Sequence, residues 1–445
     1  MSKKTTKKTT KKATSPVKDE VRLSQCMIVK NEERNIEKAL EWARDVTIEQ
    51  IVVDTGSTDR TVEMAEELGA KVFHFEWIKD FSAAKNYAIE RASGNWIAFL
   101  DADEYYTPDD AKKLLPMLSR IQSDADMNKR VMAMSNPMVQ LNDDGKPMEV
   151  FQQERIFRNH PSVRYFGRIH ERLSIYKAEN FYYTEDISIM HTGYTDTAFE
   201  ETKKASRNIE LLRAELVDNP NDLSLKAYLA DALKAEKDDE SLEEAEALYM
   251  EVITSPGSVI LILKNKAYKH FLDQYTQAAE RIEEYEEFSR MALKDNPTSL
   301  DFKCYYAAVL SRNGDYRQAF ELLKECEAKM STADVNDITV IAAKPQFLFG
   351  QMVLAAQGLG DVEEVIKYAT MILAIDKSRS EVLAPYLHTL ASQGVSMNEV
   401  ITILSGIYDL NDPQDLLLIA RTAKDIGAIE LARAIMDIAG RIMNG

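Results

Sequence analysis

Cysteine is scarce in this sequence: the 445 residues include three, Cys26, Cys304 and Cys326, and their separations match no metal-ligand spacing. We therefore expect no disulfide framework, and we expect a reduced cytoplasmic setting. Long apolar runs are missing as well, because no stretch approaches the ~20 residues that span a bilayer. Residues 1–20 lack the apolar centre of a secretory signal. We expect no transmembrane segment and a cytoplasmic location.

Positive charge is short outside the N-terminus. The formal net charge is −18, and the first 20 residues hold seven lysines against Asp19 and Glu20, a local +5 that leaves −23 for residues 21–445. The large negative charge of residues 21–445 argues against binding to nucleic acid. The lysine- and threonine-rich segment 1–20 is of low complexity, and we expect it to be a disordered, solvated tail.

Several familiar motifs are absent too. The sequence lacks G-x-G-x-x-G, G-x-x-x-x-G-K-[ST] and G-x-S-x-G, so dinucleotide, Walker-type and nucleophile-elbow sites have no support. What is present, 45% hydrophobic and 29% charged residues, is typical of a soluble globular protein. The length predicts two or three domains.

Strand and helix patterns alternate from about residue 22 to residue 103. Strands are expected at 23–29, 48–54, 70–76 and 95–101, and helices at 33–45, 57–68 and 80–93. Near-continuous apolar strands separated by helices predict a mostly parallel, Rossmann-like sheet that is covered on both faces. Ligands of such sheets bind beyond the carboxyl ends of the strands, where Asp54 and Asp101 stand.

The pattern changes twice further along the chain. Residues 130–195 read as strands and loops, with a Gly-Lys-Pro turn at 145–147, and the chain is helical after Tyr194. Segments 218–253 and 295–328 both open on Asp-Asn-Pro and predict helix pairs, and 347–376 is a looser third copy. A period of ~34 residues is the signature of tetratricopeptide-type repeats. We therefore predict an α/β domain at 21–196 and an all-α repeat domain at 197–445.

Two kinds of role are open for the repeats. The structural one is that they brace the first domain or form a dimer, and the functional one is that their concave surface holds a peptide or protein. The terminal segment 416–443 is apolar and rich in methionine. Such a face is either a solenoid cap packed inward or an oligomer interface, and we favour self-association, so a homodimer through the helical domain is expected.

Three carboxylates follow the strand at 95–101. Asp101 and Asp103 are alternate residues, so both carboxylates approach one cation, and their hard oxygens suit Mg²⁺ or Mn²⁺. The competing explanation is the N-terminus of the helix that begins near Thr107, which favours acidic residues. Asp109 and Asp110 fit that explanation, but Asp101 and Asp103 precede the helix. We therefore predict a divalent metal site.

Three quoted segments resemble a known family. "CMIVKNEERNIEKAL", "IVVDTGSTDRTVEMAEELGAKV" and "DFSAAKNYAIERASGNWIAFLDADE" have the order and spacing of family 2 glycosyltransferases, over roughly residues 22–195. The resemblance implies the GT-A fold, an inverting displacement, a nucleotide-diphosphate sugar as donor, expected to be a UDP-sugar, and Mn²⁺ or Mg²⁺ at an Asp-x-Asp motif. That motif is Asp101-Ala102-Asp103, with Asp103 the metal ligand and Asp101 nearer the ribose.

The same resemblance assigns the donor site. It implies contacts to the nucleotide sugar from a group of eight residues: Val29, Lys30, Asn31, Glu32, Asp54, Lys85, Asp101 and Ala102. Thr55 departs from the family's usual second aspartate, which puts the identity of the base in doubt. Lys85 replaces a common arginine, and a lysine contacts a diphosphate without the bidentate fork.

A narrower likeness comes from "ERIFRN", "FGRIHERL" and "MHTGY". These resemble the branch of family 2 that carries tetratricopeptide-like helices, the sublancin S-glycosyltransferase and flagellin glycosyltransferase branch. An inverting enzyme needs a base to deprotonate the acceptor, for which Glu171 is the first candidate and His170 the second. Glu171 alternatively pairs with Arg168 or Arg172. His191 is a candidate third metal ligand, unless a backbone hydrogen bond occupies it.

We interpret the chain as a metal-dependent, inverting glycosyltransferase that acts on a hydroxyl or thiol of a peptide or protein, because helical repeats suit a polypeptide. Two alternatives remain. One is a transferase that builds a cell-surface glycan. The other is a non-catalytic adaptor that binds a nucleotide sugar and recruits a partner through its repeats.

Overall fold

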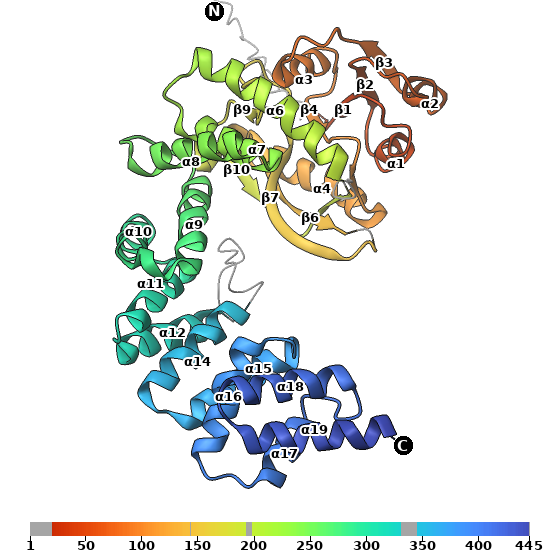
Figure 1. The fold of residues 1–445 in the computed structure, drawn as a ribbon. Coiled ribbons are helices and arrows are strands. Elements are labelled where there is room, and N and C mark those ends of the chain that lie inside the picture. The colour runs from red at the N-terminus through yellow and green to blue at the C-terminus, as the bar shows by residue number, and fades with distance from the viewer. Residues whose placement is uncertain (1–19, 143, 193–197, 331–344, 445) are drawn as a thin grey trace, which may run out of the picture. The chain divides into compact units, whose positions relative to one another are not determined.

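The computed structural model describes residues 20–142, 144–192, 198–330 and 345–444. The chain divides into two compact units, Met1–Leu248 and Tyr249–Gly445, each of which is described by itself. The first unit holds all the described strands (Figure 1). The predicted N-terminal tail falls on residues 1–19, outside the described residues, and so does the predicted boundary between residues 196 and 197, which stays a prediction.

Eleven strands are described. They are β1 (Leu23–Val29), β2 (Glu49–Asp54), β3 (Lys71–His74), β4 (Trp96–Phe99), β5 (Glu104–Tyr106), β6 (Ala133–Leu141), β7 (Pro147–Arg158), β8 (Tyr165–Phe166), β9 (Arg172–Leu173), β10 (Phe181–Tyr183) and β11 (Ile189–His191). The helices of the first unit are α1 (Ile36–Glu41), α2 (Thr61–Glu67), α3 (Phe81–Ile89), α4 (Pro108–Ser123), α5 (Ala125–Arg130), η1 (Ala178–Asn180), α6 (Ala198–Asp218) and α7 (Leu223–Glu236), and α8 (Asp239–Thr254) contains the division.

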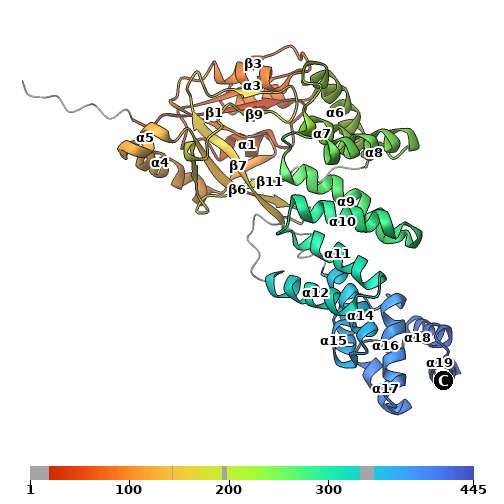
Figure 2. The ribbon, with the colours of Figure 1, turned by 90° about the vertical axis from the view of Figure 1, so that its left-hand side faces the viewer.

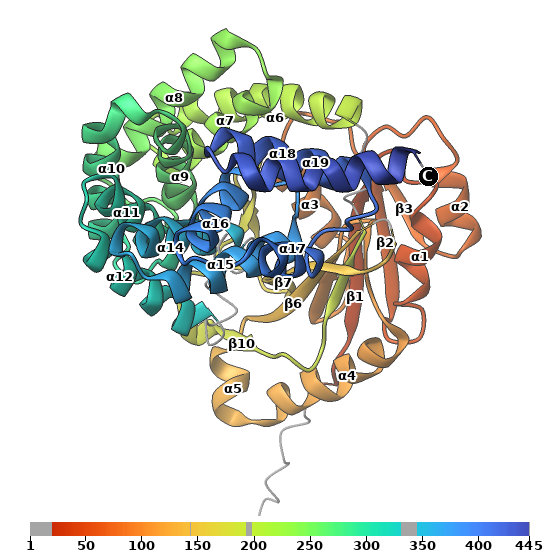
Figure 3. The same ribbon diagram turned by 60° about the horizontal axis from the view of Figure 1, so that its bottom comes forward.

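Nine strands form one mixed sheet in the order β3-β2-β1-β4-β7-β6-β11-β5, with β10 also paired to β6. The half β3-β2-β1-β4 is parallel, as the alternating pattern predicts, and Figure 3 shows β3, β2 and β1 side by side in this order. The other half mixes directions, because β7 runs antiparallel to both β4 and β6. The predicted α/β domain followed by helices is confirmed.

The two faces of the parallel half are covered by different helices. Met27 and Val29 of β1 pack with residues of α1 and α2. Cys26, which precedes Met27 and lies on the other face, packs with Ala88 and Ile89 of α3. This alternation follows from the two-residue period of a strand. Since both faces are buried, β1 is apolar at nearly every position, which is how it was recognised.

Local chemistry sets where these elements begin. The Asp80 side chain accepts a hydrogen bond from Ala83 N at 2.8 Å and starts α3, and the Thr107 side chain accepts from Asp110 N at 3.2 Å and starts α4. Gly94 precedes β4 because a Cβ there would lie 2.6 Å from the carbonyl oxygen of Arg22. These signals bring β4 alongside β1 and place the residues after both strands at one edge.

The helical hairpin α6–α7 belongs to the first unit and not to the second. Its helices pack side by side (Figure 2). Ion pairs hold it against the α/β elements: Arg168 contacts Asp218 at 2.6 Å and Glu215 at 3.4 Å, and Lys79 pairs with Glu210. The first helices after the sheet are therefore part of the same body as the sheet.

The second unit is all helical within the described residues. Its elements are α9 (Leu261–Gln277), η2 (Ala279–Arg281), α10 (Ile282–Asp295), α11 (Leu300–Arg312), α12 (Tyr316–Met330), α14 (Gln346–Leu359), α15 (Val362–Ile375), α16 (Ser380–Ser392), α17 (Met397–Ser405), α18 (Pro413–Asp425) and α19 (Ile429–Asn444). The pairs α11–α12 and α14–α15, which two of the predicted repeats cover, pack against each other as hairpins.

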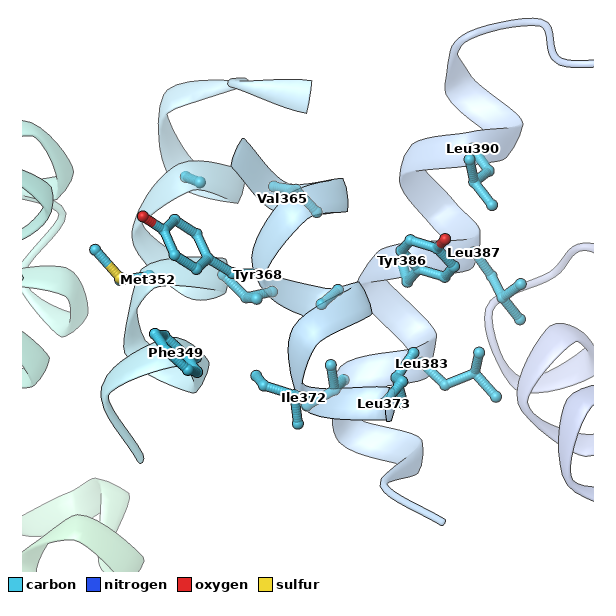
Figure 4. Packing of buried hydrophobic residues seen from close by; sticks show 14 of the residues in the cluster. Phe349, Met352, Val365, Tyr368, Ile372, Leu373, Leu383, Tyr386, Leu387 and Leu390 are labelled. Carbon is cyan, nitrogen blue, oxygen red and sulfur yellow. The ribbon is translucent and has the colours of Figure 1, made fainter. Parts of the chain in front are cut away.

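The core of this unit repeats along the chain. Figure 4 shows Phe349 and Met352 from α14 lying near Tyr368 from α15, and Leu383 and Leu387 continuing from α16. Small residues such as Ala319 and Ala369 are fully buried and let paired helices approach closely. Among the described helices, none combines the length and the apolar character needed to cross a membrane.

Candidate functional site

A cavity of about 890 Å³ opens at the carboxyl ends of β1 and β4. Its wall includes the residues that follow those strands, part of β7, the β8–β9 ribbon, His191 at the end of β11, and Arg207, Asn208 and Tyr228 from the hairpin α6–α7. Every lining residue belongs to the first unit. The position agrees with the rule that open α/β sheets bind ligands beyond the carboxyl ends of their strands.

Most of the predicted site residues meet in this cavity. Ten of them line it: Val29, Lys30, Glu32, Lys85, Asp101, Ala102, Asp103, His170, Glu171 and His191. Asn31 and Asp54 do not line it. These ten residues are spread over some 160 positions of sequence, so their convergence is a result of the fold.

Asp101 is held between two cations. Its Oδ2 lies 3.1 Å from the Arg155 guanidinium, and its Oδ1 lies 3.3 Å from the Lys85 ammonium. Burial alone would raise the pKa of Asp101, but Lys85 and Arg155 outweigh burial and lower it. Asp101 is therefore ionised and fixed in orientation at neutral pH.

Lys85 joins Asp101 to Glu171. Its ammonium lies 2.7 Å from Glu171 Oε1, and its side chain is 3% exposed. Burial alone would lower the pKa of Lys85, but the two carboxylates outweigh burial and raise it. A lysine committed to two carboxylates on a buried helix face has little freedom to contact a diphosphate. In this structure Lys85 orients the proposed base and the Asp-x-Asp segment.

Asp103 faces His191 across the cavity wall. Asp103 Oδ2 lies 3.1 Å from His191 Nε2, and His191 Nδ1 lies 2.5 Å from Gln140 Oε1. Burial alone would lower the pKa of His191, but the contact with Asp103 outweighs burial and raises it. With Nδ1–H donating to Gln140, Nε2 is the ring atom directed at the carboxylate.

This pair fits a divalent cation. A carboxylate and an imidazole nitrogen that converge within 3.1 Å have the spacing of two ligands of one ion, and both atom types bind Mn²⁺. Gln140 fixes the ring as an outer-shell partner does in metal sites. Within the described residues, no group of three or more His, Cys, Asp or Glu side chains is arranged around one point for a metal. The fit therefore rests on Asp103 and His191, with Asp101 paired to its two cations.

Arg155 is a site residue that sequence reasoning missed. It contacts Glu104 through Nε at 2.7 Å and through a second nitrogen, and it also reaches Asp101. Burial raises the pKa of Glu104, and the Arg155 guanidinium partly opposes this rise. The motif "ERIFRN" was noted, but nothing in its spacing shows which of its arginines turns inward. Only the pairing of β7 with β4 places Arg155 under the Asp-x-Asp segment.

Glu154, the residue before Arg155, was missed as well. It lines the cavity, and the Ser135 hydroxyl donates a hydrogen bond to its Oε1 at 3.1 Å. Burial raises the pKa of Glu154, which makes it a stronger base than an exposed glutamate. A buried glutamate on a long strand has no distinctive sequence pattern, so no signal in the chain would have singled it out.

Asn31, Asp54 and Thr55 connect the strand ends to one another. Asp54 accepts hydrogen bonds from Gly56 N at 3.1 Å and Ser57 N at 2.9 Å, and Asp54 is 5% exposed. Thr55 donates from both N and Oγ1 to Val29 O at 3.0 Å. Asn31, at a left-handed φ of 59°, accepts from Thr58 N. These contacts shape the turns that carry Lys30 and Glu32 to the cavity.

His170 stacks on Tyr228. The ring centroids are 3.7 Å apart and the planes are 9° from parallel. His170 has a φ of 50°, a conformation that costs a non-glycine residue about 1–2 kcal/mol. Such backbone strain clusters at functional sites. The stack joins the loop that carries Glu171 to α7.

Residues 24–168 match the family model described as Glycosyl transferase family 2. The chain thus contains a glycosyltransferase family 2 domain. The match runs from β1 to the residues just after β8 and includes the Asp-Ala-Asp segment, so the resemblance of the quoted motifs is confirmed over residues 24–168.

Curated relatives extend the similarity. A TPR repeat-containing protein of Synechococcus elongatus is 33% identical over 225 residues, 49% of this chain and 53% of that protein. The SPbeta prophage-derived glycosyltransferase SunS of Bacillus subtilis is 28% identical over 201 residues, 44% of this chain and 46% of that protein. The chain spans about half the length of the curated relatives it matches.

Solved structures give weaker matches. TarS of S. aureus in complex with UDP-GlcNAc has a TM-score of 0.33 and 16% identity, covering 52% of this chain and 80% of that chain. Glucosyl-3-phosphoglycerate synthase of Mycobacterium tuberculosis in complex with Mn²⁺, UDP and its product has a TM-score of 0.23 and 19% identity, covering 26% of this chain and 44% of that chain.

Proposed function

We propose that this protein is an inverting, metal-dependent glycosyltransferase that moves a sugar from a nucleotide-diphosphate donor, a UDP-sugar, to a hydroxyl or thiol of a peptide or protein in the cytoplasm. The observation that carries the proposal is the convergence, in one cavity of a family 2 domain, of Asp103 and His191 with Glu171.

The donor side of the cavity is formed by the strand ends. Lys30 and Glu32 follow β1, and Asp101 to Asp103 follow β4. A divalent ion bound by Asp103 and His191 would offset the negative charge that develops on the departing diphosphate. Asp101, clamped by Lys85 and Arg155, holds the backbone of this segment in place so that Asp103 is presented to the cavity.

The acceptor side contains the base. In an inverting displacement the acceptor oxygen or sulfur forms a bond to the anomeric carbon while the bond to the diphosphate breaks, and the acceptor proton moves to a base. Glu171, 15% exposed and fixed by Lys85 at 2.7 Å, is our choice for that base. Glu154 is the competing carboxylate, because burial raises its pKa.

A peptide acceptor is supported by two observations. Helix α7, which opens the first predicted repeat, contributes Tyr228 to the cavity wall, so repeat and cavity are continuous. SunS, named a glycosyltransferase, and a protein named for its TPR repeats are both similar to this chain. A peptide bound along α6 and α7 would therefore lie at the cavity wall that also includes Glu171.

The test is a screen of nucleotide sugars, beginning with UDP-GlcNAc and UDP-glucose, by thermal shift and by donor hydrolysis, with Mn²⁺ or with EDTA. We expect a donor that stabilises the protein and is hydrolysed only with metal. Asp103→Asn should lower hydrolysis by about 10³-fold, since a metal contributes several kcal/mol to the transition state. Asp109→Asn is the matched control, because Asp109 is 90% exposed and outside the cavity. Wild-type hydrolysis by Asp103→Asn would contradict the metal assignment.

The base is tested with a peptide acceptor once the donor is known. Glu171→Gln should lower turnover by about 10²–10⁴-fold with the donor dissociation constant retained. Glu154→Gln, measured in parallel, should lower turnover far less. The reverse ranking of the two variants would move the role of base to Glu154.

A further inference from the structure

The cavity contains arginines of two kinds. Arg155 is paired with Glu104 and Asp101, and Arg168, close to the cavity, is paired with Asp218 and Glu215. Arg172 and Arg207 line the cavity, and within the described part of the chain neither has a carboxylate at ion-pair distance. Their guanidinium groups therefore place positive charge at the cavity wall that no described carboxylate at ion-pair distance offsets.

Arg207 lies on α6 at the cavity wall. Its guanidinium is 5.4 Å from the centre of the Phe81 ring, and Nε and a terminal nitrogen donate to Asn208 Oδ1 at 3.3 and 3.1 Å. Both contacts are with neutral groups. The residue is solvent-exposed and lines the cavity, so its guanidinium is accessible to a bound ligand. An anion at this point would gain a charge-assisted contact without displacing an acidic side chain.

Arg172 lies on β9, opposite Phe166 of β8. Its guanidinium sits 5.4 Å from the centre of the Phe166 ring, on the same face of the ribbon. It is close enough to Tyr228 of α7 to oppose the rise that burial causes in the pKa of that tyrosine. Arg172 and Arg207 therefore belong to the same side of the cavity, the side formed by the ribbon and the hairpin α6–α7.

This side is the acceptor side, on the basis of the proposed function. Glu171, the proposed base, immediately precedes Arg172, and His170 stacks on Tyr228. The proposed metal ligands come from the ends of β4 and β11. A group bound by Arg172 and Arg207 would thus be attached to the molecule that Glu171 deprotonates.

We propose that Arg172 and Arg207 form an oxyanion subsite for the acceptor, and that the acceptor carries a carboxylate or phosphate group near the atom that receives the sugar. The planar guanidinium fork matches both groups through two parallel hydrogen bonds. For a polypeptide acceptor this means an acidic or phosphorylated residue close to the modified one. The net charge of −18 disfavours binding of such a segment to the protein as a whole, whereas the two arginines favour it at this wall.

The subsite is tested with inorganic phosphate as the probe, titrated by calorimetry into the full chain saturated with UDP and Mg²⁺. We expect phosphate to bind, and Arg172→Ala and Arg207→Ala each to weaken that binding by about tenfold or more, since a hydrogen bond to a charged group contributes about 1.5–3 kcal/mol. Arg207→Lys, which keeps the charge without the fork, should be intermediate. Arg213→Ala, on the same helix but paired with Glu244 at 2.7 Å, is the matched control and should bind phosphate as wild type does.

Three results would overturn the proposal. The first is a wild-type protein that binds no phosphate when saturated with UDP. The second is equal loss in Arg207→Ala and Arg213→Ala, which would mean a general charge effect. The third is a tenfold loss of UDP affinity in Arg207→Ala, which would assign the arginine to the donor diphosphate. The nucleotide-free protein is titrated separately with UDP and with phosphate. Failure to bind the donor nucleotide is thereby distinguished from failure to bind phosphate. Thermal unfolding of each variant checks that it is folded.

Discussion

Around the cavity of the first unit the buried side chains carry charge, whereas the core of the helical unit is built from alkyl and aromatic groups. Lys85 is 3% exposed and Glu104 is 3% exposed, and both are paired with opposite charges. In the helical unit, Phe349 and Met352 of α14 and Leu383 of α16 belong to one cluster of buried apolar side chains (Figure 4).

The contrast separates residues that build a scaffold from residues that prepare chemistry. Apolar contacts are non-directional and tolerate exchange, so they specify helix pairing without specifying a reaction. Buried ion pairs cost free energy to assemble and are costly to break, yet they fix orientation. The first unit gives up stability for orientation near Asp101 and Glu171. In the helical unit the buried Asp415 pairs with Lys377, whose side chain is 46% exposed.

The largest effect on stability is expected from removal of the buried cation Arg155. Arg155→Met leaves the buried Glu104 without its cationic partner and Asp101 with Lys85 alone, and we expect a loss of about 3–5 kcal/mol in the free energy of unfolding. Urea unfolding followed by circular dichroism measures it. Arg213→Met removes an exposed arginine whose pair with Glu244 should contribute less than about 1 kcal/mol. Equal effects of the two changes would show that the buried network contributes nothing to stability.

An apolar deletion in the helical unit should cost almost as much without affecting the cavity. Leu383→Ala removes a fully buried side chain of α16, and we expect about 2–5 kcal/mol of lost stability. Leu354→Ala, at a position 48% exposed, is the control. Titration with UDP reports on the first unit, and its dissociation constant should stay the same in Leu383→Ala. A weaker UDP complex would show that the core of the helical unit supports the cavity.

The pH dependence of stability provides a further test, at the buried carboxylate of Glu49, which is far from the cavity. Burial alone would raise the pKa of Glu49, but hydrogen bonds from Lys71, Ser93 and Ser24 outweigh burial and lower the pKa to about 2. Since the folded pKa is below the unfolded one, this stabilisation is present above about pH 4.5 and is lost as the pH falls towards 2.

Glu49→Gln should therefore lower stability by about 1.5–3 kcal/mol at pH 7, and by progressively less as the pH falls below 4.5. Unfolding midpoints between pH 2 and pH 7 measure the effect. Glu63→Gln, at an exposed helix position, is the control and should follow the wild-type curve closely. A difference between Glu49→Gln and wild type that is independent of pH would contradict the assignment.

The smallest expected effect concerns the packing of α14 on α12. A Cβ at Gly358 would lie 2.3 Å from the Tyr316 ring, so Gly358→Ala should destabilise by about 1–3 kcal/mol. Gly350→Ala in the same helix meets nothing within 4 Å and should stabilise by about 0.5–1 kcal/mol, because alanine is the better helix former. Thermal unfolding of the two variants measures both. The same sign for both changes would mean that Tyr316 moves away.

Much of the first unit was predictable because its signals are local. The alternation of apolar strands and helices from 22 to 103 predicts β1 to β4, and the structure confirms each of these strands within one or two residues at most ends. Helix ends were less well predicted: the pattern at 33–45 corresponds to α1 at Ile36–Glu41, because the last turns loosen into bends. Helices also appear in all three segments where the repeat pattern places them, and the helices of two of these segments, α11–α12 and α14–α15, pack against each other as hairpins.

The cavity itself was predictable only in part. Asp101, Asp103, Glu171 and His191 were named from motifs, and the fold brings them together. The partners Arg155, Glu104 and Glu154 were not, because a charged residue in a strand gives no sign of the face it will occupy until the pairing register is known. Likewise, Arg207 and Tyr228 lie in helices whose sequence shows only a repeat pattern.

By itself, the sequence determined the order of the elements, the family 2 domain, the helical repeats and the Asp-Ala-Asp segment, since these depend on periodicity and short spacings. Only the tertiary structure decided that Asp101 is clamped by Lys85 and Arg155, that Asp103 meets His191, and that helices α6 and α7 close the wall with two arginines that lack acidic partners in the described chain. The physical reason is that contacts between residues far apart in sequence depend on strand register and helix docking, which no local pattern encodes.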